Sequence, residues 1–194
     1  HVGWVSSDDG ILVYDSNGSG SIDNINELFG DITTLGTVEL AGYDVNLDGV
    51  IDADDGIFSQ LQLWQDFNQD GVSDAGELKY LSEYNILSID VDVNNLVEEN
   101  LELEGNMILS SSSYRFTQMQ EVTTTIIDDN GNEVTTTTTQ EVIKTNLISN
   151  LDLAIDQANS ESYSYHDTDG SLVDYDLNID TLLLPQSRGY GNLA

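Results

Sequence analysis

Short apolar runs alternate with acidic stretches over the first 93 residues. Within ADDGIFSQLQLWQD at 53–66, four apolar residues recur at helical spacing: Ile57, Phe58, Leu61 and Trp64. This pattern predicts a short helix. A second short helix is expected to begin near Ala75, and NELFGD at 26–31 predicts one helical turn. We therefore expect helix-loop-helix units joined by shared helices in this part of the chain.

From about Val91 the chain becomes rich in Thr and Ser with alternating apolar residues. Residues 114–147 predict two long strands, because Asn130-Gly131 is a strong hairpin signal. The threonine run fits exposed strand faces of a structural hairpin, although a long edge strand is also a possible docking site for another protein. In 146–156 the spacing of Leu147, Leu151 and Ile155 predicts a helix packed on this sheet.

These patterns together predict an α+β fold in two regions. Residues 1–93 are expected to carry EF-hand-like calcium loops with short helices, and residues 94–194 an antiparallel β-hairpin or sheet with one helix. The sequence leaves open whether the two regions form one continuous domain.

The stretch DVNLDGVIDADD at 44–55 crowds acidic residues into one loop. Neighbouring carboxylates repel by roughly 1 kcal/mol per pair even in water, so a compensating charge is expected. The spacing fits the calcium loop D-x-[DN]-x-[DN]-G-x5-E, whose ligands come from positions 1, 3, 5, 7, 9 and 12. The expected ligands are Asp44, Asn46, Asp48, the Val50 carbonyl, Asp52 and Asp55, with Gly49 at the turn. Asp replaces the usual Glu at the last position.

Two further loops repeat this spacing. DFNQDGVSDAGE at 66–77 fits without exception, with Asp66, Asn68, Asp70, the Val72 carbonyl, Asp74 and Glu77. DSNGSGSIDNINE at 15–27 offers Asp15, Asn17, Ser19, the Ser21 carbonyl, Asp23 and Glu27, but Glu27 comes one place late. Ile22 and Ile51, just after the carbonyl ligands, are expected to be buried together; Ser73 departs from that pattern. About three calcium ions are predicted.

Asp, Asn and Gly also form turns without any metal. Three successive loops, two of them with an acid at position 12, favour the metal. By contrast, HDTDG at 166–170 has Asp167, Asp169 and Gly170 in a metal-like order, but the rest of the calcium-loop pattern does not follow, so it predicts a turn. No nucleophile motif accompanies His166.

The net charge limits the classes of partner that the chain is expected to bind. Against 36 acidic residues stand four basic ones, Lys79, Arg115, Lys144 and Arg188, which gives a formal net charge of −32. This charge disfavours nucleic acid and anionic lipid and makes cations the natural partners. The chain has no cysteine, so oxygen ligands remain for a metal. No apolar run is long enough to predict membrane insertion.

Several of these features resemble the calcium-dependent self-processing module of repeat-in-toxin (RTX) proteins and related large, secreted, hemolysin-type calcium-binding proteins. They are Gly3-Trp4, Asp9-Gly10, the three loops, ELFG at 27–30, Trp64 and GEL at 76–78. LPQSRGYG at 184–191 is a further similarity.

The resemblance implies secretion through a bacterial type I system and a calcium-bound state that organises cleavage of an upstream Asp-Pro bond. There the aspartate side chain attacks its own carbonyl to give an anhydride, which can pass its acyl group to a lysine. This chain departs from that pattern, because its one proline, Pro185, follows Leu184. We expect no catalytic residue and no activity in this chain, although the longer protein could cleave itself.

The leading hypothesis is therefore a secreted, calcium-folded module within a larger polypeptide. The alternative is a calcium-stabilised adhesion or docking module, since the 22-residue step from Asp44 to Asp66 also fits a dockerin. The helix that the two loops would share and the additional loop before them do not fit that alternative.

Overall fold

The computed structural model describes residues 4–31, 33–103, 106–153 and 181–187. It forms a nine-stranded sheet in the order β2-β5-β7-β8-β9-β1-β3-β4, with β6 paired to β7. The strands are β1 (Gly10–Val13), β2 (Val50–Asp52), β3 (Gln62–Trp64), β4 (Leu78–Tyr80), β5 (Ile86–Asp90), β6 (Val97–Leu103), β7 (Asn106–Ile127), β8 (Glu133–Leu153) and β9 (Thr181–Ser187). β9 runs parallel to both β8 and β1 and joins strands from the two halves of the chain.

Few helical residues are present in the described part of the chain. One short α-helix, α1, covers Gly36–Ala41, and four 3-10 turns cover Ile25–Glu27, Phe58–Gln60, Leu81–Tyr84 and Val93–Asn95. The prediction of EF-hand-like loops flanked by short helices is therefore wrong. None of the helices in these described ranges is long and apolar enough to cross a membrane.

The helix predicted over 53–66 is instead a 3-10 turn followed by strand β3. β3 lies between β1 and β4, and both of its faces are buried. Leu63 packs into one core cluster and its neighbour Trp64 into the other. Successive strand side chains point to opposite faces, so a doubly buried strand is apolar at consecutive positions and resembles a buried helix in sequence.

The other two predicted helices are also mainly extended. Near Ala75 the chain forms β4 and then the 3-10 turn Leu81–Tyr84. In 146–156, β8 continues to Leu153 and pairs with β7 and β9. Leu147 and Leu151 are four residues apart, a spacing that places them on one face of a strand as well as of a helix. Ile155 lies outside the described residues.

Two apolar clusters pack against the sheet. The larger contains Leu12, Leu40, Ile51, Leu63 and Ile89 among others. The smaller contains Ile11, Val13, Ile22, Trp64 and Leu151. In β1, Leu12 and its neighbours Ile11 and Val13 divide between the two clusters, as alternate strand positions must.

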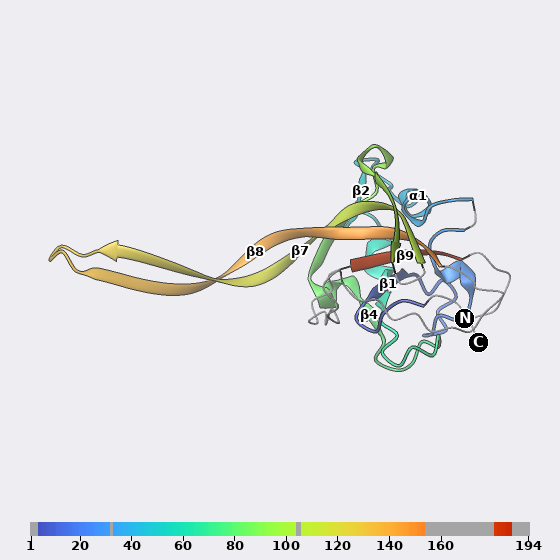
Figure 1. The fold of residues 1–194 in the computed structure, drawn as a ribbon, viewed down its shortest axis with the longest axis horizontal. Helices are drawn as coiled ribbons and strands as arrows, with labels where there is room; N and C mark the ends of the chain where they lie inside the picture. Colours follow the sequence, from blue (N-terminus) through green and yellow to red (C-terminus); the bar gives the residue numbers. More distant parts are fainter. Residues whose placement is uncertain (1–3, 32, 104–105, 154–180, 188–194) are drawn as a thin grey trace.

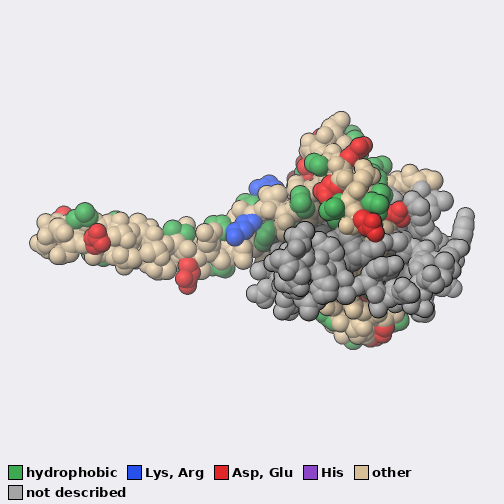
Figure 2. Space-filling view, viewed as in Figure 1, with side chains coloured by type: hydrophobic (Ala, Val, Ile, Leu, Met, Phe, Trp, Pro, Cys, Tyr) green, Lys and Arg blue, Asp and Glu red, His purple; other side chains and the backbone are tan. Residues whose placement is uncertain are grey.

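The predicted hairpin around Asn130-Gly131 is present. β7 and β8 pair antiparallel from Met107 opposite Asp152 to Ile127 opposite Glu133. Their distal part, which we call the arm (117–143), projects far from the body as a two-stranded ribbon (Figure 1). The hydroxyls of Thr123 and Thr137 hydrogen-bond across it at 3.1 Å. Figure 2 shows mostly uncharged side chains along the arm, with acidic side chains spaced apart on it.

Candidate metal sites in three acidic loops

The three acidic loops share one backbone shape. In each loop the fourth and sixth residues have positive φ, although the fourth is glycine in only one of them. The angles are 71° and 82° at Gly18 and Gly20, 59° and 86° at Leu47 and Gly49, and 59° and 75° at Gln69 and Gly71. A positive φ is uncommon for Leu and Gln. The repetition therefore indicates a conformation that the loop pattern imposes.

The first carboxylate of each loop sets this shape by accepting backbone N–H groups. Asp44 Oδ1 accepts from Leu47 at 2.7 Å, and its Oδ2 accepts from Gly49 at 2.8 Å. Asp15 accepts in the same way from Gly18 and Gly20, both at 2.8 Å. Asp66 accepts from Asp70 at 3.2 Å and from Gly71 at 2.8 Å.

The last acid of each loop closes it from the other side. Asp55 accepts from the N–H of Asp52 at 3.2 Å and of Val45 at 2.8 Å. Glu77 accepts from Asp74 and from Phe67, both at 3.0 Å. In both loops the two donors are the ninth and second residues, so the loop ends are tied together.

Glu27 fulfils part of this role although it stands one place late. Its Oε2 accepts from the N–H of the ninth residue, Asp23, at 2.9 Å, and from Asn24 at 3.2 Å. The 3-10 turn Ile25–Glu27, capped by the Asn24 side chain, accommodates the additional residue. Glu27 Oε1, however, is buried without a hydrogen-bond partner.

The closing carboxylates are buried, unlike most of the loops they close. Exposed fractions are 1% for Glu27, 2% for Asp55 and 5% for Glu77. Of the first acids, Asp44 and Asp66 are also buried, and Asp15 is half-buried. The third-position residues Asn17, Asn46 and Asn68 are exposed, as are the fifth-position residues Ser19, Asp48 and Asp70. Each loop thus has a buried anionic base and a polar rim open to solvent.

Two of the loops are joined directly. The Ile22 N–H donates to Ser73 Oγ at 2.7 Å, and both residues stand at the eighth loop position. The 44–55 loop instead contains β2, which pairs with β5, and the Gly49 carbonyl accepts from the N–H groups of Val91 and Asp92. Ile22 and Ile51 are both buried but belong to different core clusters, so the prediction that they pack together is wrong.

The described loops direct their carboxylates at backbone N–H groups. Within the ranges that the structure describes, no group of three or more His, Cys, Asp or Glu side chains could hold a metal ion. The predicted ligand sets are mixed: each combines carboxylates with Asn or Ser oxygens and one backbone carbonyl.

Sequence reasoning did not identify the indole groups beside the 66–77 loop. Trp4 Nε1 donates to Asp66 Oδ2 at 2.5 Å, and Trp64 Nε1 donates to Glu77 Oε2 at 3.3 Å. Gly3-Trp4 and Trp64 contributed to the family resemblance but gave no sign of this contact. His166, Asp167, Asp169 and Gly170 lie outside the described residues.

Comparison with known proteins assigns a family to the part of the chain that holds all three loops. A sequence profile of the SPM domain matches residues 1–129, about two thirds of the chain. The chain belongs to the SPM domain family. The matched region ends in the turn between β7 and β8, so β8 and β9 lie beyond it although they complete the sheet of this SPM domain protein.

A curated relative extends this comparison. The SPM domain protein is 47% identical over 123 residues to the iron-regulated protein FrpA of Neisseria meningitidis serogroup C. The match covers 59% of this chain and 11% of FrpA, so the chain spans a small part of that relative's length.

Proposed function

We propose that this SPM domain protein is a calcium-binding module with one ion in each of the three acidic loops. The observation that carries the proposal is the shared loop geometry, in which positions four and six are left-handed and the first acid accepts the N–H of the sixth residue. In calcium loops this wrapping lets alternate residues reach one cation that takes six to eight oxygens.

Burial of the loop carboxylates supports the same conclusion. An ionised carboxylate removed from water is destabilised unless it is paired or coordinated to a metal. Asp66 is fully buried and Glu27 nearly so, in a chain with four basic residues against 36 acidic ones. The backbone N–H groups offset part of that cost, but Glu27 Oε1 has no hydrogen-bond partner. A bound dication would supply the missing partner.

The donor set favours calcium over magnesium. Each loop offers Asp oxygens, an Asn oxygen and the carbonyl of Ser21, Val50 or Val72. Magnesium prefers six ligands in a tight octahedron and keeps several waters, whereas calcium accepts a larger and less regular oxygen cage. Three bound dications would change the formal net charge from −32 to about −26.

The setting of the module in a longer protein is also a proposal. The resemblance to RTX self-processing modules and the partial match to the much longer FrpA support a module within a large secreted polypeptide. Outside the cell calcium is abundant, and a loop at ten times its dissociation constant gains about 1.4 kcal/mol of stability. Any self-cleavage would occur at an Asp-Pro bond outside this chain, because Pro185 follows Leu184.

Calcium binding can be assigned loop by loop with three variants, Asp15→Asn, Asp44→Asn and Asp66→Asn. Each substitution keeps the side-chain size and removes the first carboxylate of one loop. Competition with a calcium indicator should give about three sites in the wild type and about two in each variant. Unchanged stoichiometry in all three variants would contradict the site assignment.

Self-processing needs a separate test on a chain extended upstream to an Asp-Pro bond. We expect two shorter products on a denaturing gel after calcium addition, and none with magnesium. An extended chain that stays intact in calcium while its loops are filled would limit the function to calcium binding.

A further inference from the structure

Two tryptophans hold the two ends of the 66–77 loop. Trp4 donates its indole N–H to Asp66, the first acid of the loop, and Trp64 donates to Glu77, the last. The two rings meet edge to face, with centroids 5.5 Å apart and an interplanar angle of 65°. Trp64 and Asp66 are fully buried. Trp4 packs against the smaller core cluster, to which Trp64 belongs.

The N-terminal segment (residues 4–9) is fastened to the same loop by its backbone. Gln69 Nε2 donates to the Val5 carbonyl at 3.2 Å, and Gln65 Nε2 donates to the Asp8 carbonyl at 3.3 Å. The Val5 side chain is buried in the smaller core cluster. Residues 65–69 therefore hold the N-terminal segment at three points, one of which is Asp66.

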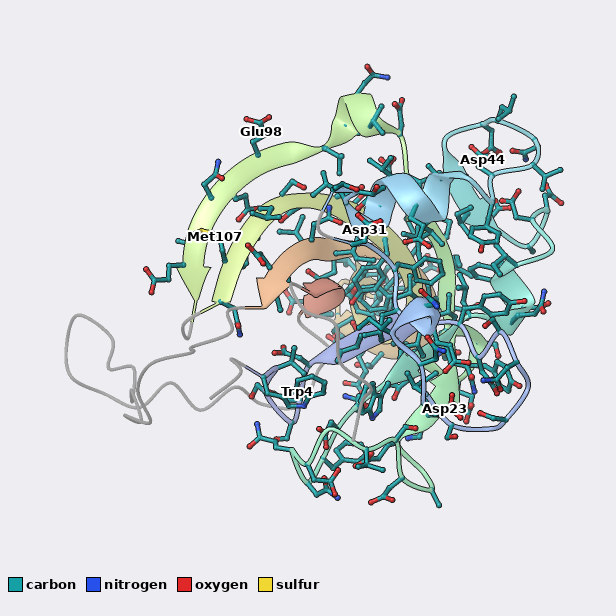
Figure 3. All side chains as sticks on the ribbon, turned by 90° about the vertical axis from the view of Figure 1, so that its right-hand side faces the viewer. Trp4, Asp23, Asp31, Asp44, Glu98 and Met107 are labelled. Carbon is teal, nitrogen blue, oxygen red and sulfur yellow. The ribbon has the colours of Figure 1, made fainter. Side chains whose placement is uncertain are left out.

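The 44–55 loop has a different environment. Its first acid, Asp44, accepts from backbone N–H groups of its own loop, and the loop is joined to β5 through β2. Figure 3 shows Asp44 and Trp4 on distant parts of the body. A hydrogen-bonded contact to the N-terminal segment thus distinguishes the 66–77 loop from the 44–55 loop.

We propose that Trp4 is a positioning residue for the 66–77 loop, which links ion binding there to the docking of the N-terminal segment. The inference rests on the proposed calcium function. The Trp4 N–H holds the Asp66 carboxylate in its loop orientation and satisfies one of its lone pairs, as partners of metal ligands commonly do. Because coupling between two equilibria is reciprocal, an ion in this loop must in turn stabilise the docked segment.

The test measures terbium binding by the full chain, with terbium replacing calcium as a luminescent probe. Tryptophan excitation reports the 66–77 loop, since Trp4 and Trp64 contact its end carboxylates. Trp4→Phe removes the N–H but keeps a ring against Trp64, which still sensitises the ion. We expect affinity at this site to fall about tenfold. The matched control is Tyr43→Phe, an aromatic change beside the 44–55 loop, which should leave the terbium affinity of the 66–77 loop unchanged.

Hydrogen exchange gives a second readout that a merely structural role of Trp4 would not change. Calcium should slow amide exchange in residues 4–9 of the wild type, and this effect should be lost in Asp66→Asn. Trp4→Phe binding that matches the wild type, or calcium-independent exchange of residues 4–9, would overturn this inference alone. A wild-type chain that binds neither calcium nor terbium would overturn the proposed function together with it.

Discussion

The backbone N–H of Ile22 donates to the hydroxyl oxygen of Ser73 at 2.7 Å and joins two acidic loops at equivalent positions. In the sequence Ser73 departs from the apolar residues that occupy this position in the other two loops. Its polarity has a structural reason, because the Ser73 hydroxyl accepts a hydrogen bond that the buried Ile22 would otherwise lack. The 15–27 and 66–77 loops are therefore mechanically connected.

Ser73→Ala should destabilise the protein by about 1–3 kcal/mol, because the buried Ile22 N–H loses its partner. Urea unfolding measures this free energy. Ser73→Thr keeps the hydroxyl and is the matched control. An alanine variant as stable as the wild type would show that the contact contributes nothing to folding.

Asn150→Ala should cost on the order of 3 kcal/mol of unfolding free energy. Asn150 is fully buried and accepts from the Thr37 backbone N–H at 3.0 Å, and it donates to Thr37 Oγ1 and Ser110 Oγ. Its removal leaves these buried groups unpaired and detaches the start of α1 from β8. Asn130→Ala, in an exposed turn, is the control and should change stability by about 0.5 kcal/mol or less. Equal effects of the two substitutions would refute this role.

Shortening the arm should leave the body folded. No member of either core cluster lies between Thr117 and Asn146 in the described chain, and Met119, Ile127 and Ile143 are exposed. Replacing residues 118–142 by Asn-Gly, which favours a two-residue hairpin turn, should therefore change the melting temperature by no more than about 4 °C. A much larger fall would mean that the arm contributes to the core.

The arm's turn should resist acid until well below neutral pH. Asn132 donates its backbone N–H to Asp128 at 2.8 Å, and this contact, with others in the turn, lowers the Asp128 pKa from its ordinary value of 3.8. A group with a lowered pKa in the folded state stabilises that state above its unfolded pKa, and this contribution is lost as pH falls through the folded value. Amide shifts of Asn130 and Asn132 should therefore change at a midpoint below 3.8.

A midpoint above the ordinary value would contradict this account of the turn. Asp128→Asn removes the titrating group and should abolish the transition, whereas Asp129→Asn should leave it in place.

The sequence predicted the loops better than the elements around them. The spacing of Asp, Asn and Gly depends on local contacts, so the left-handed glycine at the sixth position follows from the pattern within each loop, whereas the left-handed fourth residue was not predicted. The hairpin was predictable for the same reason, because Asn130-Gly131 specifies its own turn.

The helices were mispredicted because burial from both sides cannot be seen in a local pattern. Leu63 and Trp64 face different core clusters, an arrangement that depends on β3 lying between β1 and β4. The pairing of β9 with β1 joins residues more than a hundred positions apart. Likewise, the Trp4 contact with Asp66 spans 62 positions, so no motif could have revealed it.

The most direct test of the calcium account is a calorimetric titration of the chelator-stripped protein with calcium, followed in parallel by far-UV circular dichroism, with magnesium as the control. We predict saturable binding of about three calcium ions with a gain in ordered structure that magnesium does not reproduce. Absence of saturable calcium binding would mean that the three loops are only turns, and the proposed function would lose its physical basis.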